Sequence, residues 1–185
     1  MSDPSASKVA RRRRRWWLFV ATPVVALLVV WGLNYLLVGQ PVQRQLSADP
    51  RNKGYSLNAH YGYYVDPSVL VLDLRAVEGA APVDLFRGLF QSAQALHESR
   101  RRFDKVVLAR AGTPVFLMEG KEFSAIGSEF SAGQNPVYLI RTLPGKLFQP
   151  SGQAAFGRWE GGLLGVLGKE MEDANEAARQ WASGK

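Results

Sequence analysis

The strongest constraint on this chain is an uncharged stretch that runs from residue 16 to residue 43 of its 185 residues. The apolar core of this stretch, Trp16 to Val38, contains 23 residues. A helix of that length rises roughly 34 Å at about 1.5 Å per residue, and a hydrocarbon core of about 30 Å needs around 20 residues. A single strand would leave its backbone polar groups unpaired in lipid. The sequence therefore predicts a transmembrane helix over residues 16–38, with the lipid bilayer as its partner.

The residues at the start of this stretch predict its orientation. They are five arginines and two tryptophans: Arg11, Arg12, Arg13, Arg14, Arg15, Trp16 and Trp17. Positive charge is retained on the cytoplasmic side, and tryptophan is enriched at membrane interfaces. The N-terminus is therefore expected in the cytoplasm and the C-terminal part in an extracytoplasmic, periplasmic compartment. Because a cleaved signal peptide has an apolar region of only about 7–15 residues, we expect an uncleaved signal anchor in the inner (cytoplasmic) membrane.

The net charge of +7 is concentrated at the N-terminus. Residues 1–15 carry six positive charges and one negative charge, so they contribute +5 and the rest of the chain only +2. A nucleic-acid-binding domain spreads Lys and Arg over a folded face, so no nucleic-acid partner is expected. The chain has no Cys and two His, which excludes thiolate metal sites and makes a His-rich metal centre a poor hypothesis. We expect no cofactor.

Composition shifts divide the chain into four parts. Residues 1–15 form a basic cytoplasmic tail, and residues 16–38 form the signal-anchor helix. Residues 39–54 are polar and contain two Pro, which is typical of a linker. Residues 55–185 are long enough for one hydrophobic core and no more. We therefore expect a single extracytoplasmic domain after a short stalk.

Hydrophobic periodicity predicts the elements of this domain. Alternation indicates a half-buried strand over 55–65 and a turn at 66–68, and a strand over 69–75 that is apolar on both faces is typical of a sheet centre. A helical pattern over 82–102, between strands, predicts a right-handed crossover and a parallel neighbour. Further strands are expected over 106–110 and 115–118, with helices over 121–130, from Asn135 and over 159–181. The fold class is α+β (mixed α/β), in two layers, with about four mixed strands and three to four helices on one face.

Three groups of residues are candidates for protein contacts. Asn34 within the span can hydrogen-bond a partner helix, or it meets water at the headgroup level. The tyrosines Tyr61, Tyr63 and Tyr64 can bind a partner, or they cover the core and face water with their hydroxyls. Gly161 and Gly165 lie four residues apart, which favours close packing on the sheet or on a second subunit. The alternative for these glycines is a loop, and a homo-oligomer stays open.

One group of residues is a weaker candidate for a ligand site. Asp73 is a carboxylate within a strand that is otherwise apolar, and it lies toward the end of the strand where sheets with parallel strands bind ligands. The simpler interpretation is an ion pair with Arg75, because a buried carboxylate needs a partner. His60 joins these two residues as a candidate because folding can bring it close to Asp73.

The sequence therefore favours a binding role over catalysis. It contains no Gly-x-Ser-x-Gly elbow. We expect a single-pass, membrane-anchored accessory or assembly subunit whose extracytoplasmic domain binds other envelope or membrane-complex proteins. The alternative is a membrane-tethered enzyme or small-ligand sensor that uses Asp73 with an adjacent histidine.

Overall fold

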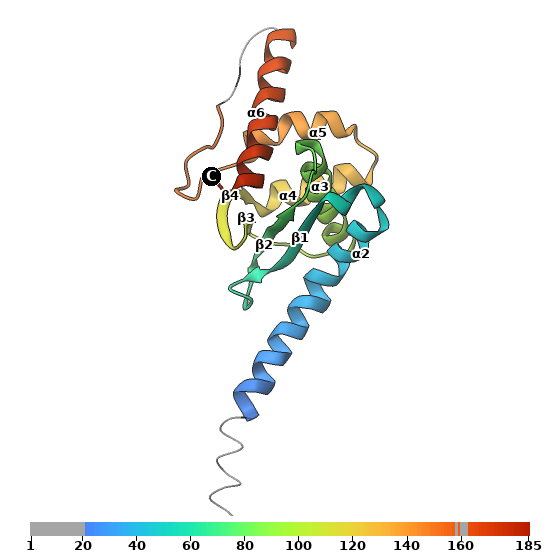
Figure 1. The fold of residues 1–185 in the computed structure, drawn as a ribbon, viewed down its shortest axis with the longest axis vertical. Coiled ribbons are helices and arrows are strands. Elements are labelled where there is room, and N and C mark those ends of the chain that lie inside the picture. Colours follow the sequence, from blue (N-terminus) through green and yellow to red (C-terminus); the bar gives the residue numbers. More distant parts are fainter. Residues whose placement is uncertain (1–20, 158, 160–162) are drawn as a thin grey trace, which may run out of the picture.

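The N-terminal part of the structure is one long helix. The computed structural model describes residues 21–157, 159 and 163–185, so the candidate residues Arg11 to Trp17 and Gly161 lie outside the described residues. Ala21–Ala48 is a single helix that is long and apolar enough to cross a membrane, and Figure 1 shows it projecting from one side of the folded domain. Its middle contains a short π-helical segment, η1 (Tyr35–Gly39), and its last part is α2 (Gln40–Ala48).

The prediction of a polar linker over residues 39–54 is wrong. The helix continues through this segment, and a 3-10 turn, η2 (Pro50–Gly54), leads directly into the first strand. Val42 and Leu46 of α2 are buried in the same hydrophobic core as the rest of the domain. The polar residues that suggest a linker occupy the outer side of a helix whose inner side packs against the domain. The folded domain therefore begins before residue 55.

The first two strands form a hairpin whose turn comes three residues earlier than the sequence predicts. β1 (Tyr55–Gly62) pairs antiparallel with β2 (Asp66–Val77). The turn is formed by residues 63–65, and the Val65 N–H donates to the Gly62 carbonyl at 3.0 Å. The expected turn at 66–68 is instead the start of β2. Residues 66–68 have a composition typical of a turn, but they lie in the strand. There the Asp66 carboxylate accepts hydrogen bonds from the Ser68 amide and hydroxyl.

The sheet has the predicted mixed topology. β3 (Lys105–Arg110) runs parallel to β2, and β4 (Thr113–Glu119) runs antiparallel to β3, in the order β1-β2-β3-β4. The crossover from β2 to β3 is α3 (Pro82–Glu98), which starts at a proline, as helices favour. β2 and β3 therefore form a central parallel pair, with an antiparallel strand on each side.

The remaining helices follow β4. They are α4 (Gly120–Ser131), α5 (Pro136–Thr142), the 3-10 turn η3 (Pro144–Lys146) and α6 (Leu163–Ser183). The predicted cap of α5 is confirmed, because Asn135 Oδ1 accepts from the Val137 amide at 2.9 Å. Figure 1 shows the helices gathered together beside the sheet. The mixed α/β fold is as predicted.

The hydrophobic core lies between the helices and one face of the sheet. Leu70, Leu72 and Leu74 of β2 are fully buried on this face. Trp181 of α6 is also buried, and its Nε1 donates to the Ala109 carbonyl at 2.9 Å. Successive residues of a strand point to opposite faces, so the intervening residues of β2 lie on the second face. Among the described residues, no helix covers that face.

Candidate functional site

The N-terminal helix is hydrogen-bonded to the outer edge of the sheet. Asn34 is buried within this helix, and its Oδ1 accepts from the Tyr61 amide of β1 at 2.8 Å. Its Nδ2 donates to the Val30 carbonyl at 3.0 Å and to the Tyr64 carbonyl in the hairpin turn. Asn34 therefore contacts its own domain, which neither interpretation from the sequence anticipates.

Two further contacts extend this attachment along β1. Gln43 Nε2 donates to the Leu57 carbonyl at 2.6 Å. Between Asn34 and Gln43 the helix passes so close to the strand that a Cβ at Gly39 would lie 3.5 Å from the Ala59 carbonyl oxygen. Unpaired groups on an edge strand invite aggregation and are usually covered. Here the helix covers the edge of the sheet and joins the domain to the apolar segment without a flexible connection.

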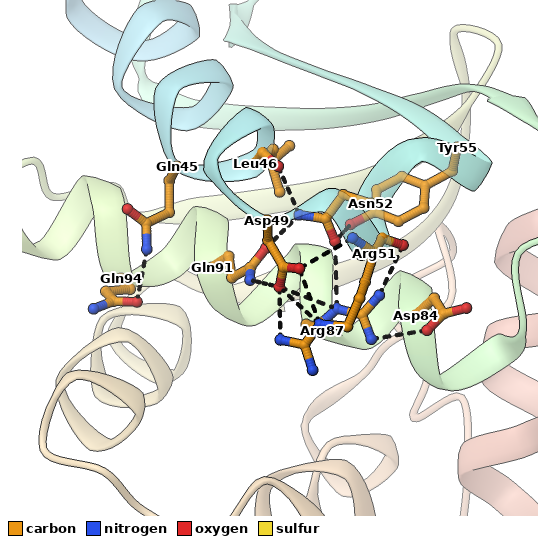
Figure 2. A network of polar contacts seen from close by, with 10 residues as sticks. All are labelled: Gln45, Leu46, Asp49, Arg51, Asn52, Tyr55, Asp84, Arg87, Gln91 and Gln94. Atoms are coloured by element: carbon orange, nitrogen blue, oxygen red, sulfur yellow. Dashed lines mark hydrogen bonds and ion pairs between the residues drawn. The ribbon is translucent and has the colours of Figure 1, made fainter.

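A buried asparagine connects the end of the N-terminal helix to α3. Asn52 Nδ2 donates to the Leu46 carbonyl at 2.8 Å and to Gln91 Oε1 at 2.7 Å. Its Oδ1 accepts from the Tyr55 hydroxyl at 2.8 Å and from Arg87 Nε at 3.3 Å. Figure 2 shows these contacts converging between the helix end and α3. Asn52 thus holds four neighbours in place at once.

Asp49 forms the charged part of the same network. Its carboxylate pairs with the Arg51 guanidinium at 2.7 Å and accepts from Gln91 Nε2 at 2.9 Å (Figure 2). The hydrogen bond from Arg51 holds the pKa of Asp49 well below its usual range. Burial raises the pKa of Tyr55 above its ordinary value. Asp49 therefore stays ionised and Tyr55 stays protonated around neutral pH, and both keep their hydrogen bonds.

The predicted tyrosine cluster is divided between the core and the hairpin turn. Tyr61 is partly buried and packs against Phe103, with ring centroids 6.4 Å apart. Tyr63 is 93% exposed. Tyr64 stacks on His60 with centroids 4.2 Å apart, and His60 Nδ1 lies 2.8 Å from the Tyr61 carbonyl oxygen. Only Tyr63 and Tyr64 are therefore available for contacts outside the domain.

The turn holds both of these tyrosines in an unfavourable backbone conformation. Tyr63 has φ +48° and Tyr64 has φ +63°, in the left-handed region that costs most L-residues roughly 1–2 kcal/mol. Turns of this kind normally contain Asn and Gly. Tyr64 recovers part of the cost by stacking on His60, whereas the exposed Tyr63 ring gains little from the domain. We call Tyr63, Tyr64 and Val65 the hairpin tip.

Replacing Tyr63 with asparagine is expected to stabilise the domain. The Tyr63→Asn variant should raise the free energy of unfolding by about 1 kcal/mol, because Asn tolerates the left-handed region. Urea unfolding of the full chain in detergent micelles measures the change. The Val65→Asn variant, at a position of the turn without positive φ, is the control and should give no gain. An unchanged midpoint for Tyr63→Asn would contradict the assigned strain.

The uncovered face of the sheet carries a hollow of about 610 Å³. Its floor is formed by partly buried apolar side chains of three strands: Val69, Val71, Val107 and Leu117. Charged and aromatic residues surround this floor: His60, Tyr63, Tyr64, Asp73, Arg75 and Lys105. Strand register places Val71, Val107 and Leu117 side by side in one row. We call this surface the sheet-face hollow.

Asp73 has the structural partner that the simpler interpretation predicts. Its Oδ2 lies 2.8 Å from Arg75 Nη2 in an ion pair. Its Oδ1 accepts from the Gly112 amide at 3.0 Å, in the turn between β3 and β4. Asp73 is completely buried, whereas the Arg75 side chain is 44% exposed. The carboxylate therefore stabilises a turn, and no described contact links it to His60.

Of the two glycines predicted to pack closely, only Gly165 lies among the described residues, and it shows no close packing there. A Cβ added at Gly165 would meet no atom within 4 Å in the described structure, so a contact between Gly165 and a second subunit stays a prediction. Close approach occurs instead at Gly127 of α4, where an added Cβ would lie 2.8 Å from the Ala93 carbonyl carbon of α3. The sequence gives no equivalent signal there, because Gly127 has no glycine partner four residues away.

The residues that join the helix to the domain were not predicted, although the sequence carries a signal for them. Val38, Val42 and Leu46 are spaced by four, which is a helical stripe that crosses the expected linker. Asp49 followed by a proline is typical of the start of a new helical turn. The partners of these residues lie far away in the sequence, and only the fold reveals them.

The described residues contain no metal-binding group, since no three His, Asp or Glu side chains among them come together in a suitable cluster. The features that can act outside the domain are thus the apolar N-terminal helix, the hairpin tip and the sheet-face hollow. Comparisons of the chain with known family models, with curated proteins and with solved structures found no match.

Proposed function

We propose that the chain is a single-pass protein of the cytoplasmic membrane. The helix Ala21–Ala48 supports this proposal, since Val24, Leu28 and Trp31 are among its many large apolar side chains exposed to solvent. Such a surface is costly in water and favourable in lipid. The five arginines before the helix favour a cytoplasmic N-terminus and an extracytoplasmic (periplasmic) domain.

The domain acts as an accessory or assembly subunit that binds a second membrane or envelope protein through the sheet-face hollow. The observation that supports this surface is that the parallel pair β2 and β3 has helices on one face only, as far as the described residues go. Sheets made only of parallel strands are covered on both faces, and in this mixed sheet the central parallel pair has one open face. Here Val71 and Val107 on the second face are only partly buried. A partner that covers these valines completes the missing layer.

The occupant that fits best is an amphipathic helix of the partner protein. A helix is the element that normally covers a parallel sheet, and its apolar face would lie along the row of Val71, Val107 and Leu117. Lys105 and Arg75 stand at opposite ends of the floor, because Lys105 pairs with Val69 and Arg75 lies six residues further along β2. An acidic residue at one end of the partner helix would complement Lys105, whereas Arg75 already pairs with Asp73.

The rigid junction favours a partner in the same membrane. Asn34 and Gln43 hold the edge of the sheet to the N-terminal helix, so the hollow stays at a constant height above the bilayer. A partner helix close to the membrane surface then meets the hollow without a search through many orientations, which lowers the entropic cost of association. This arrangement suits an assembly subunit.

The enzyme or sensor alternative has weaker support. Asp73 and His60 line the same hollow, as that alternative requires. However, Arg75 and Gly112 occupy the Asp73 carboxylate, and the His60 ring is covered by Tyr64. A general acid–base pair needs groups within hydrogen-bond reach of each other and of the substrate. The described contacts favour structural roles for both residues.

Co-purification of paired variants tests the proposed binding surface. The intact chain is isolated in mild detergent from the cells that produce it, and the proteins that accompany it are identified by mass spectrometry. The Val107→Asp variant places a charge in the middle of the hollow and should reduce recovery of the partner more than tenfold. This follows because a central contact is worth about 2 kcal/mol or more, and each 1.4 kcal/mol is about tenfold.

The control is the Val137→Asp variant, at an exposed valine of α5. A protein counts as the partner only if Val107→Asp loses it and Val137→Asp retains it. Recovery of the wild-type chain alone and monomeric would contradict an assembly role. Equal loss of the partner from both variants would contradict the assignment of the surface.

A further inference from the structure

We propose that the hairpin tip lies in the headgroup region of the membrane that the N-terminal helix crosses. The domain would then contact the bilayer at two points, through the helix and through Tyr63, Tyr64 and Val65. This inference rests on the membrane span proposed above, but no binding partner is needed for it.

The hairpin tip is attached to the apolar helix at a defined level. Asn34 accepts from the Tyr61 amide at 2.8 Å and donates to the Tyr64 carbonyl. Trp31, Tyr35 and Tyr64 line one recess of about 310 Å³ between the helix and β1. Figure 1 shows the tip of the β1–β2 hairpin on the side of the domain from which the helix projects. The tip therefore lies beside the helix at about the position of Asn34.

This level coincides with the expected boundary of the bilayer. A hydrocarbon core of about 30 Å needs around 20 helical residues, and Tyr35 lies 20 residues after Arg15, the last charge before the span. The exposed apolar surface of the helix ends at Leu36, whereas Val38 is buried in the domain. The length of the span and the end of the exposed apolar surface both place the boundary of the hydrocarbon core next to Tyr35, and hence next to the hairpin tip.

The side chains of the tip suit the headgroup region. Tyr63 is 93% exposed, Tyr64 is 44% exposed and Val65 is 66% exposed, and the three carry no charge. Tyr and Trp are enriched at membrane interfaces because an apolar ring and a polar tip meet lipid and water at once. Trp31 and Tyr35 stack on each other with centroids 6.1 Å apart. Tyr64 of the tip lines the same recess as these two rings, so aromatic side chains of the helix and of the tip lie close together.

The backbone strain of the tip gives an independent argument. Both tyrosines have positive φ, although Asn and Gly suit such a turn better. Residues held in strained conformations cluster at sites where the strain serves function. Within the domain, the Tyr63 ring is almost entirely exposed and contributes little to stability. Contact with lipid supplies a reason for an aromatic residue at this position.

Fluorescence quenching by lipid tests the inference in the full chain. The chain has no Cys, so single cysteines introduced at chosen positions can be labelled with a nitrobenzoxadiazole fluorophore. The informative variant is Val65→Cys. Its matched control is Glu78→Cys, which is also exposed and lies beyond the opposite end of β2. Leu28→Cys reports whether the helix itself lies in the bilayer. The labelled chains are reconstituted into vesicles of phosphatidylethanolamine and phosphatidylglycerol, with or without nitroxide lipids.

We expect headgroup nitroxides to quench the label at residue 65 and to leave the label at residue 78 bright. Acyl-chain nitroxides should quench the label at residue 28. Adding Tyr63→Ser to the Val65→Cys chain should weaken the quenching at residue 65, because the aromatic anchor is lost. This double variant shows whether the tyrosine or the attached fluorophore draws the hairpin tip into the membrane.

Failure of the hairpin inference and failure of the membrane span give different results. If the label at residue 28 is quenched and the label at residue 65 stays as bright as that at residue 78, the hairpin inference is overturned and the membrane span stands. If the label at residue 28 is not quenched, the proposed span fails and the hairpin inference fails with it. Quenching at residue 65 that is unchanged by Tyr63→Ser overturns the role given to the tyrosine.

Discussion

Replacing Gly127 with alanine is expected to lower the free energy of unfolding of the domain by about 3 kcal/mol. The added Cβ would lie 2.8 Å from the Ala93 carbonyl carbon and closer still to the carbonyl oxygen. Both atoms belong to the backbone of α3, which cannot move aside as a flexible side chain can. The two helices must therefore separate, and part of the packing around Phe90 and Phe130, whose rings lie 5.9 Å apart, is lost.

Urea unfolding of the full chain in micelles measures this loss. The matched control is Gly168→Ala, because Gly168 lies inside α6 and an added Cβ there would meet no atom of the described structure within 4 Å. Alanine in a helix interior should stabilise the domain by about 1 kcal/mol relative to glycine. A Gly127→Ala variant that is as stable as the wild type would contradict the close packing of α3 on α4. Destabilisation by Gly168→Ala would point to a packed contact at that glycine.

Replacing Asn52 with leucine is expected to destabilise the domain by a similar amount, about 3 kcal/mol. The change removes both donors and the acceptor of a buried side chain. The Tyr55 hydroxyl and Gln91 Oε1 then lose their partner in a region sheltered from water. Each buried polar group without a partner costs about 1–3 kcal/mol. The Leu46 carbonyl, at the end of the N-terminal helix, also loses the Asn52 side chain and keeps the Asp49 amide at 3.3 Å.

The same unfolding measurement tests this prediction. Asn58→Leu is the control, because Asn58 is an exposed residue of β1, and exposed substitutions usually change stability by less than about 0.5 kcal/mol. Equal stability of the two variants would show that the network in Figure 2 contributes little. The expected pattern is a large loss for Asn52→Leu alone.

Periodicity predicts most of the fold because local patterns encode it. Alternation identifies β1, and the doubly apolar segment identifies β2 as a central strand. The helical stripe of α3 between two strands gives the parallel pairing of β2 and β3, which then determines the sheet. These signals depend on residues close together in the sequence, so one sequence suffices to read them.

The candidate surfaces were harder to predict because they depend on distant contacts. The sequence indicates that Asn34 is a polar residue in a membrane span. In the structure it is hydrogen-bonded to the backbone of Tyr61 and Tyr64. The polar composition of residues 39–54 suggests a linker, since the sequence does not show that Asn52 will meet Arg87 and Gln91. The open second face of the sheet was expected, because a two-layer fold with its helices on one face leaves the other face uncovered, and no helix of the described residues covers it.

The proposed function and the hairpin inference both depend on a membrane helix that continues into the folded domain. The direct test is a scan of single nitroxide labels from residue 24 to residue 48, in the full chain reconstituted in vesicles. The scan records probe mobility and accessibility to oxygen and to a water-soluble nickel complex. We predict that labels at 24–33 are accessible to oxygen and shielded from nickel. Over 40–48 we predict a helical period in mobility with minima at Val42 and Leu46. Nickel accessibility at 24–33, or uniformly mobile labels over 40–48, would contradict the account.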